Sequence, residues 1–286
     1  DYHPSITNLF KISGKIFIKA LFLSKKYDIL VAEYGIDTPG DMDHLLQVAI
    51  PDIVVLTKLD SVHSANFSHG IEEYWQEKWK LLLAAKKKVY LNLQDDFSRK
   101  NISFLTHYGE IFEELHFWSK LQKDEKDIAR WHFIYNNRHI SLNLLGEENI
   151  VYTKLGLDIA QDFWINLSEN KYDFDFELQA GRFTLFQKWE NIFIDSSYNA
   201  APESMRQVLE NTKLLQKKLF PLHKIIVVLG DMRELWKNSP SAHQKLATYL
   251  WGIQAWFFIG PQMYEHLIPQ LQKSWIKYEI HASLSA

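Results

Sequence analysis

Residues 29–63 constrain the fold of this chain more than any other stretch. Residues 29–32 and 53–56 are short, continuous apolar runs rich in β-branched side chains, and each indicates a buried strand. Between them, a loop rich in glycine and proline precedes a predicted helix over 42–49, with Asp41 as its N-cap. Because a helix joins the two strands, they are expected to pair in parallel. The stretch therefore predicts an α/β fold built on a parallel sheet.

The carboxyl ends of these two strands carry candidate ligand-binding residues. Ligands of parallel sheets bind beyond the carboxyl ends of the strands. Glu33 follows the first run directly, and His63 lies a few residues beyond the second. Together they are candidates for holding a hard divalent cation, with water or phosphate oxygens completing its coordination. The alternative is that Glu33 only caps the strand or pairs with a basic residue.

Downstream, the pattern continues with a helix over 71–88, which carries Lys78, and a strand over 89–93. By itself, Lys78 is typical of a solvated helix face. Alternating segments within 132–144 predict an antiparallel hairpin that turns at two consecutive asparagines. The charged run 120–126 is predicted as a solvated loop or helix face, and one short helix is predicted near 157–167.

A second domain is expected to begin at about residue 178, which divides the chain into domains 1–177 and 178–286. Strands alternating with helices again predict a parallel α/β layer. The predicted strands are 192–194, 225–229 and 255–260, and the predicted helices are 203–218 and 241–251. The polar loop 195–202, between a strand and a helix start, suits a ribose or a phosphate, although an ordinary capped loop explains it equally well. Gly230-Asp231 occupies the same position after the next strand.

Composition excludes several classes of protein. A net charge of -3 gives no basic surface for nucleic acid. The absence of cysteine excludes disulfides, thiolate metal sites and thiol nucleophiles. No apolar run approaches the ~18 residues of a membrane helix, so membrane insertion is not expected. We expect a cytoplasmic monomer.

Several stretches, in the right order, resemble a known family. They match the Mur ligases of peptidoglycan synthesis, in the branch that adds D-alanyl-D-alanine to UDP-N-acetylmuramoyl-tripeptide. The matching stretches are Glu33-Tyr34-Gly35 with Pro39-Gly40-Asp41-Met42; 51–57 with His63 and Phe67; Glu77-Lys78; Gly181-Arg182; 195–204; and 229–235 with His243. The motifs D-S-S-Y-N-A-A-P and L-G-D-M-R-E-L are the most specific of these.

The resemblance implies an incomplete Mur-ligase central domain with a parallel sheet, followed by a Rossmann-like C-terminal domain. It implies an ATP-dependent carboxylate–amine ligase acting through an acyl phosphate on UDP-MurNAc-tripeptide and D-Ala-D-Ala. By the same resemblance, Glu33, His63 and a carbamylated Lys78 are Mg²⁺ ligands, and His63, Lys78 and Arg182 take part in catalysis. Asp195, Tyr198, Asn199 and Arg182 are implied to contact the nucleotide.

The sequence also departs from the family pattern. Lys58 and Ala201 replace asparagines, and Glu148 stands where the family has histidine in G-x-H-N. The 286 residues contain neither the Gly-Lys-Thr phosphate loop, nor the domain that binds UDP, nor the final K-G-S segment. We therefore expect a ligase fragment that neither binds ATP tightly nor turns over alone. One alternative is a degenerate, non-catalytic binding or scaffold module. Another is a folylpolyglutamate-type or cyanophycin-type ligase, against which the two specific motifs argue.

Overall fold

The computed structural model describes residues 28–57, 66–92, 99, 111–112, 119–165, 167–233, 235 and 238–273. The chain divides into two compact units, Asp1–Gly35 and Ile36–Ala286. Within the first unit, residues 28–35 have irregular backbone, and Leu30 and Val31 are 82% and 92% exposed. The strand predicted over 29–32 is therefore wrong. A strand requires the N–H and C=O groups of a neighbour, and no strand among the described residues pairs with this run.

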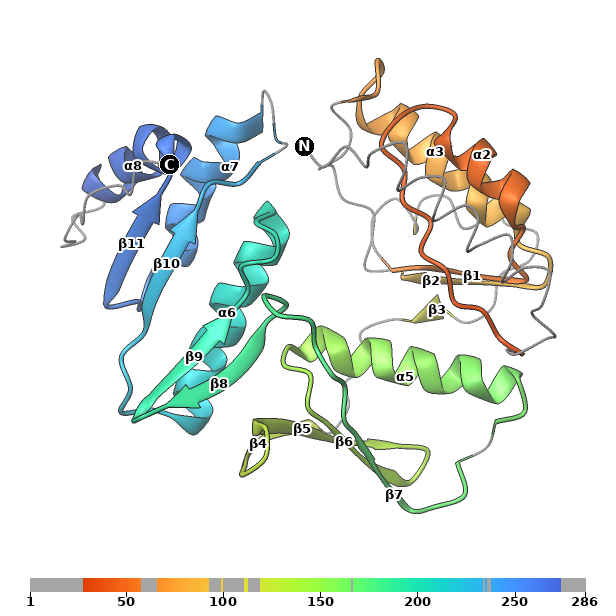
Figure 1. The fold of residues 1–286 in the computed structure, drawn as a ribbon, viewed down its shortest axis with the longest axis horizontal. Helices are drawn as coiled ribbons and strands as arrows, with labels where there is room; N and C mark the ends of the chain where they lie inside the picture. The colour runs from red at the N-terminus through yellow and green to blue at the C-terminus, as the bar shows by residue number, and fades with distance from the viewer. Residues whose placement is uncertain are drawn as a thin grey trace, which may run out of the picture. The chain divides into compact units, whose positions relative to one another are not determined.

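The first sheet of the second unit is parallel, as predicted. Its strands β1 (Ile53–Leu56), β2 (Lys88–Asn92) and β3 (Ile111–Phe112) lie in that order. Helices α2 (Asp41–Val48) and α3 (Ile71–Ala84) confirm the predicted helices. They lie on one side of the sheet, and α5 (Glu147–Asp162) lies on the other (Figure 1). Because Tyr90 packs against Leu155 of α5, β2 is covered on both faces, which explains its continuous apolar sequence.

A four-stranded sheet follows, in the order β4 (Ser119–Asp124), β5 (Ile128–Tyr135), β6 (Arg138–Leu142) and β7 (Lys171–Phe174). The predicted hairpin is confirmed: Asn136 and Asn137 have φ of 46° and 61°, the left-handed conformation that a two-residue hairpin turn requires. Strand β7 pairs in parallel with β6.

Two predictions for this part of the chain are wrong. The charged run 120–126 is mostly strand β4, because Leu121 is buried against the core while its charged neighbours point to solvent. The short helix expected near 157–167 is instead the 16-residue helix α5, which begins at Glu147 and ends at Asp162. Its buried residues Ile150, Leu155 and Leu157 pack onto two different clusters, and this splitting obscured the apolar stripe in the sequence.

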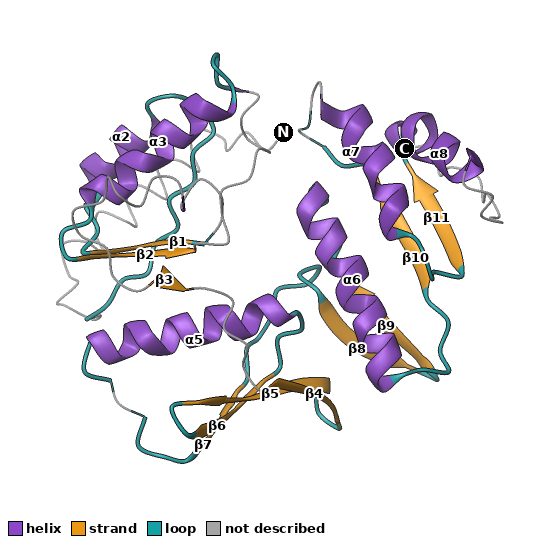
Figure 2. Ribbon diagram, turned by 180° about the vertical axis from the view of Figure 1, so that it is seen from behind, coloured by secondary structure: helices purple, strands orange, loops and turns teal. Residues whose placement is uncertain are grey.

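The hairpin of β8 (Thr184–Lys188) and β9 (Asn191–Asp195) leads into helix α6 (Pro202–Leu219). Figure 2 shows α6 alongside this hairpin. Leu215 of α6 belongs to the same core cluster as Trp131 of β5 and, at its edge, Leu185 and Ile194 of the hairpin. This cluster contains residues from both sides of the expected domain boundary at 177/178, so that boundary stays a prediction.

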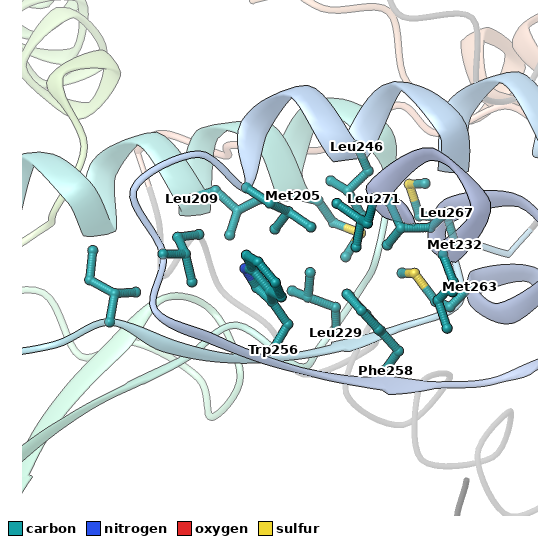
Figure 3. Close-up of a cluster of buried hydrophobic side chains, with 14 of the residues drawn as sticks. Met205, Leu209, Leu229, Met232, Leu246, Trp256, Phe258, Met263, Leu267 and Leu271 are labelled. Atoms are coloured by element: carbon teal, nitrogen blue, oxygen red, sulfur yellow. The ribbon is translucent and has the colours of Figure 1, made fainter. Parts of the chain in front are cut away.

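The last α/β layer is the parallel pair of β10 (Ile226–Gly230) and β11 (Ala255–Ile259). Helices α7 (Ser239–Leu246) and α8 (Ile268–Lys273), with the 3-10 helix η4 (Ala247–Tyr249) and the π-helix η5 (Met263–Leu267), complete it. Figure 3 shows the core, in which Leu229, Trp256 and Phe258 of the strands meet helical methionine and leucine side chains. The predicted elements of this region are confirmed within a few residues, whereas strands β7 and β8 were not predicted.

Candidate functional site

A turn at Gly181-Arg182 and the loop after β9 lie side by side. Strands β8 and β9 pair Thr184 with Asp195, so the residues before β8 and after β9 come out at the same end of the hairpin. The backbone N–H of Tyr198 donates to the carbonyl of Gly181 over 3.1 Å. Gly181 has φ of +80°, and a Cβ there would lie 2.7 Å from the Tyr198 nitrogen. Only glycine allows the turn to approach the loop this closely.

This close approach places the guanidinium of Arg182 over the ring of Tyr198, with its Cζ 4.0 Å from the ring centroid. Both side chains are exposed, and Tyr198 is 61% accessible. A guanidinium offers five N–H donors in a plane that matches phosphate, and a tyrosine ring offers a face for a base or sugar. The pair is therefore suited to a phosphorylated, aromatic ligand such as a nucleotide.

Asp195 and Asn199 complete the loop at this end of the hairpin. Asp195 accepts hydrogen bonds from the hydroxyl and the backbone N–H of Ser197, the latter over 3.0 Å, and these lower the pKa of its carboxyl group. The Asn199 side-chain oxygen accepts the backbone N–H of Ala200 over 2.8 Å. Helix α6 then begins with no side-chain cap at Ala201. The structure thus brings the four residues predicted for nucleotide binding to one end of the hairpin.

Gly230-Asp231, the other predicted loop, has an internal role instead. The Asp231 carboxylate accepts the backbone N–H groups of Gln262 (3.1 Å) and Met263 (2.8 Å) and so caps the helix after β11. His243 is fully buried: its Nε2 accepts the N–H of Met232 over 3.0 Å, and its Nδ1 donates to the carbonyl of Ser239 over 2.8 Å. The residues of the G-D-M…H motif therefore connect neighbouring elements by hydrogen bonds. Because the Asp231 carboxylate is used in this way, the structure does not support a ligand role for it.

The three residues predicted to bind a metal fall in different parts of the chain. His63 lies outside them. Glu33 is exposed and belongs to the unit Asp1–Gly35, which is described by itself. Lys78 is partly buried on α3, with its ammonium 5.8 Å from the centroid of the Tyr74 ring. The described part of the chain holds no group of three His, Asp or Glu side chains that fits a metal ion. An ammonium is not a ligand, so Lys78 fits a metal only once carbamylated.

Asp41, the predicted N-cap of α2, is inside the helix, and its carboxylate instead accepts the N–H groups of Asp37 (2.9 Å) and Thr38 (2.7 Å) in the preceding loop. The acceptor at the start of the helix is Glu77, which comes from α3 and is 6% exposed. The family resemblance singles out Glu77-Lys78, but nothing in the sequence indicates that Glu77 accepts from this loop, because its partners there lie more than 30 residues away.

The fold is α/β, and the four residues predicted for nucleotide binding lie together at one end of its C-terminal hairpin. Residues 1–152 match the Mur ligase middle domain, and residues 181–284 match the glutamate ligase domain of the Mur ligases. The chain belongs to the Mur ligase family. In the described part of the chain, no helix is both long and apolar enough to cross a membrane.

Curated relatives of the chain carry the name UDP-N-acetylmuramoyl-tripeptide--D-alanyl-D-alanine ligase. The protein from Rickettsia prowazekii is 24% identical over 258 residues, covering 82% of this chain and 54% of the relative. The protein from Borreliella burgdorferi is 26% identical over 227 residues, covering 76% of this chain and 47% of the relative. This chain therefore spans about half the length of these relatives.

Several solved structures share the fold. The MurF ligase of Thermotoga maritima, in complex with ADP, superimposes with a TM-score of 0.68 at 18% identity, covering 94% of this chain and 67% of that one. MurF from Acinetobacter baumannii gives a TM-score of 0.68 at 18% identity, covering 93% and 63%. The folylpolyglutamate synthase of T. maritima gives 0.54 at 17% identity, covering 97% and 63%. The predicted fold class is confirmed.

Proposed function

We propose that this chain contributes the nucleotide-binding part of an ATP-dependent carboxylate–amine ligase that joins D-alanyl-D-alanine to UDP-MurNAc-tripeptide in the cytoplasm. The observation that carries the proposal is the stacking of Arg182 on Tyr198 of the β9–α6 loop. The hydrogen bond from Tyr198 to Gly181 holds the two residues close together. Support comes from the names of the relatives and from the ADP in the Thermotoga neighbour.

The chemistry follows from the ligase class. The γ-phosphoryl group of ATP passes to the substrate carboxylate and leaves ADP; the amine of D-Ala-D-Ala then attacks the acyl phosphate, loses a proton and expels phosphate. Charge develops on phosphate oxygens, so positioning and electrostatics provide most of the catalysis. We assign Arg182 to donate to phosphate oxygens, Tyr198 to stack on the nucleotide and Asn199 to donate through its NH₂ group. Asp195, kept charged by Ser197, holds the loop in shape and accepts from ribose hydroxyls.

Mg²⁺ would neutralise phosphate charge in this reaction. We keep Glu33, His63 and carbamylated Lys78 as its proposed ligands, tested by titration with Mn²⁺ observed by electron paramagnetic resonance. Binding that is lost together in Glu33→Gln, His63→Gln and Lys78→Met supports this set. Binding that survives all three overturns it.

Nucleotide binding by the chain tests the central claim. Arg182→Ala is expected to weaken ADP binding about tenfold, since it removes a charged contact worth ~1–2 kcal/mol. The matched control is Lys188→Ala, because Lys188 lies 4.7 Å over the ring of Trp189 at the other end of the same hairpin. Calorimetry should show ADP binding unchanged in the control. Equal affinities in both variants would contradict the site.

Mass spectrometry of a reaction with ATP, Mg²⁺, UDP-MurNAc-tripeptide and D-Ala-D-Ala tests the reaction. ADP binding without any product, from this chain or from a protein that contains it, favours the binding-module alternative. Product formed only when a folate and glutamate replace UDP-MurNAc-tripeptide and the dipeptide favours a folylpolyglutamate-type ligase. Robust turnover by the 286 residues alone would overturn the expectation that they need a further part.

A further inference from the structure

Glu77 places a carboxylate at the start of helix α2 from a different element of the fold. Its Oε1 accepts the backbone N–H of Gly40 over 3.0 Å and that of Met42 over 3.1 Å. Its Oε2 lies 2.8 Å from the ammonium of Lys80, which in turn donates to Asp43 of α2 over 2.6 Å. The side chain of Glu77 is 7% exposed, so water screens these interactions weakly.

The loop before α2 depends on this carboxylate. Asp41 organises the loop from within by accepting the N–H groups of Asp37 and Thr38. Gly40 then turns the chain with φ of +90°, and the carboxylate that receives its N–H comes from α3. Glu77 therefore fixes the loop and the rotation of α3 relative to one another.

Lys78 is the next residue of α3, about 100° further around the helix. Its ammonium lies 5.8 Å from the ring of Tyr74, which is itself buried edge-on against Phe67. A rotation of α3 would carry Lys78 away from its present place. We propose that Glu77 is a positioning residue that holds Lys78 where it can be carbamylated, by tying α3 to the Gly40 loop. This inference rests on the role given to Lys78 in the proposed function.

A second explanation for any effect of Glu77 must be separated from positioning, namely the negative charge that it places beside Lys78. Two conservative substitutions separate them. Glu77→Gln keeps the reach of the oxygen acceptor and removes the charge. Glu77→Asp keeps the charge and withdraws the acceptor by one methylene. Positioning predicts that Glu77→Asp lowers carbamate occupancy and that Glu77→Gln leaves it unchanged. An effect of charge predicts that Glu77→Asp leaves occupancy unchanged and that Glu77→Gln raises it, because a nearby carboxylate disfavours both the neutral amine and the anionic carbamate.

The experiment is ¹³C NMR of the full chain in ¹³CO₂-bicarbonate, with Lys78→Arg identifying the carbamate resonance. In carbamylation the neutral amine of Lys78 attacks CO₂, an N–C bond forms and one proton is released. We expect carbamate occupancy to fall about fivefold in Glu77→Asp, which corresponds to one weakened hydrogen-bond pair, and to stay near that of the unsubstituted chain in Glu77→Gln. Glu72→Asp, on the exposed face of α3, is the matched control and should change nothing.

Amide hydrogen exchange at Gly40 and Met42 gives a second readout, with faster exchange expected in Glu77→Asp only. Carbamate that persists in Glu77→Asp, or whose occupancy changes in Glu77→Gln alone, overturns the inference and leaves the proposed function intact. A chain in which no carbamate forms on Lys78 overturns both the inference and the assigned role of Lys78. Loss of carbamate in Glu77→Asp together with faster exchange supports the inference.

Discussion

The carboxylate of Asp231, at the end of β10, accepts the backbone N–H of Met263 over 2.8 Å and so caps the helix that follows the neighbouring strand β11. It accepts the N–H of Gln262 as well, over 3.1 Å. The N–H groups at a helix start are a common binding site for phosphate, and here the chain satisfies two of them itself. These two N–H groups are therefore already satisfied, whereas the proposed nucleotide site lies at the β9–α6 loop.

Asp231→Ala is expected to lower the free energy of unfolding by about 1–2 kcal/mol, the usual cost of losing a cap. Urea denaturation followed by circular dichroism measures it. Asp52→Ala is the control, because Asp52 and Lys87 form a surface ion pair over 3.4 Å with both side chains more than half exposed. The control should cost less than ~1 kcal/mol. Equal losses would mean that the cap of Asp231 contributes no more than a surface charge.

Gly260→Ala tests the space around the Asp231 carboxylate. Gly260 has φ of +104°, and a Cβ there would overlap the carboxylate of Asp231. Gly252 also has a positive φ, +79°, but its Cβ would meet nothing within 4 Å. Gly252→Ala should therefore cost only the left-handed backbone, about 1 kcal/mol, whereas Gly260→Ala should cost at least ~1 kcal/mol more. Thermal and urea unfolding of the two variants provide the comparison, and equal stabilities would contradict it.

Ala201→Asn should stabilise the chain by about 1 kcal/mol. Ala201 is the N-cap of α6 and provides no side-chain acceptor, whereas asparagine is among the strongest caps. The backbone N–H of Ala201 is already bonded to the hydroxyl of Ser204 over 3.1 Å, so the loop is in place to receive the new cap. The measurement is the midpoint of urea unfolding, with Ala200→Asn as the control. A midpoint that stays unchanged would show that the amides of α6 gain nothing from a side-chain cap.

The cluster of Lys88, Tyr90 and Asp162, which ties β2 to the end of α5, predicts a loss of stability in alkali. Burial, together with the hydrogen bond to Asp162, raises the pKa of Tyr90 to about 12. Burial lowers the pKa of Lys88, but the hydrogen bond that Lys88 donates to Asp162 over 2.7 Å outweighs burial and raises this pKa to about 12. Both folded-state values exceed the unfolded ones, near ~10, so this stability is complete below pH ~10 and is lost as the pH rises through about 12.

The same cluster also predicts a loss of stability in acid. Hydrogen bonds from Lys88 and Tyr90 lower the pKa of Asp162. The stability that Asp162 contributes is therefore present above its unfolded-state pKa and is lost as the pH falls through its folded-state pKa.

The alkaline loss is measured by urea unfolding from pH 8 to 11.5, which should show a steeper loss of stability in the unsubstituted chain than in Asp162→Asn. Parallel curves for the two proteins would contradict the assignment.

The sequence by itself determined the features that depend on neighbouring residues. The alternation of apolar runs and helices predicted β1, β2, β10 and β11, because short runs of β-branched and aromatic residues favour strands. Asn136 and Asn137 predicted their hairpin, because they tolerate positive φ. The resemblance of Gly181-Arg182 and of the 195–204 loop to family motifs named Arg182, Asp195, Tyr198 and Asn199, which the fold brings to one end of the β8–β9 hairpin.

Only the tertiary structure decided which polar residues are used inside the protein. Asp231 and Asp195 look alike in sequence, each following an apolar strand, yet Asp231 caps a helix that starts some 30 residues later. Glu77 differs from Glu72 only because the Gly40 loop reaches it. The run 29–32 looks like a strand but has no partner strand among the described residues. The charged run 120–126, in contrast, is mostly a strand, because Leu121 is buried in a core cluster. Hydrogen bonds and burial depend on partners distant in sequence, and the local pattern does not contain them.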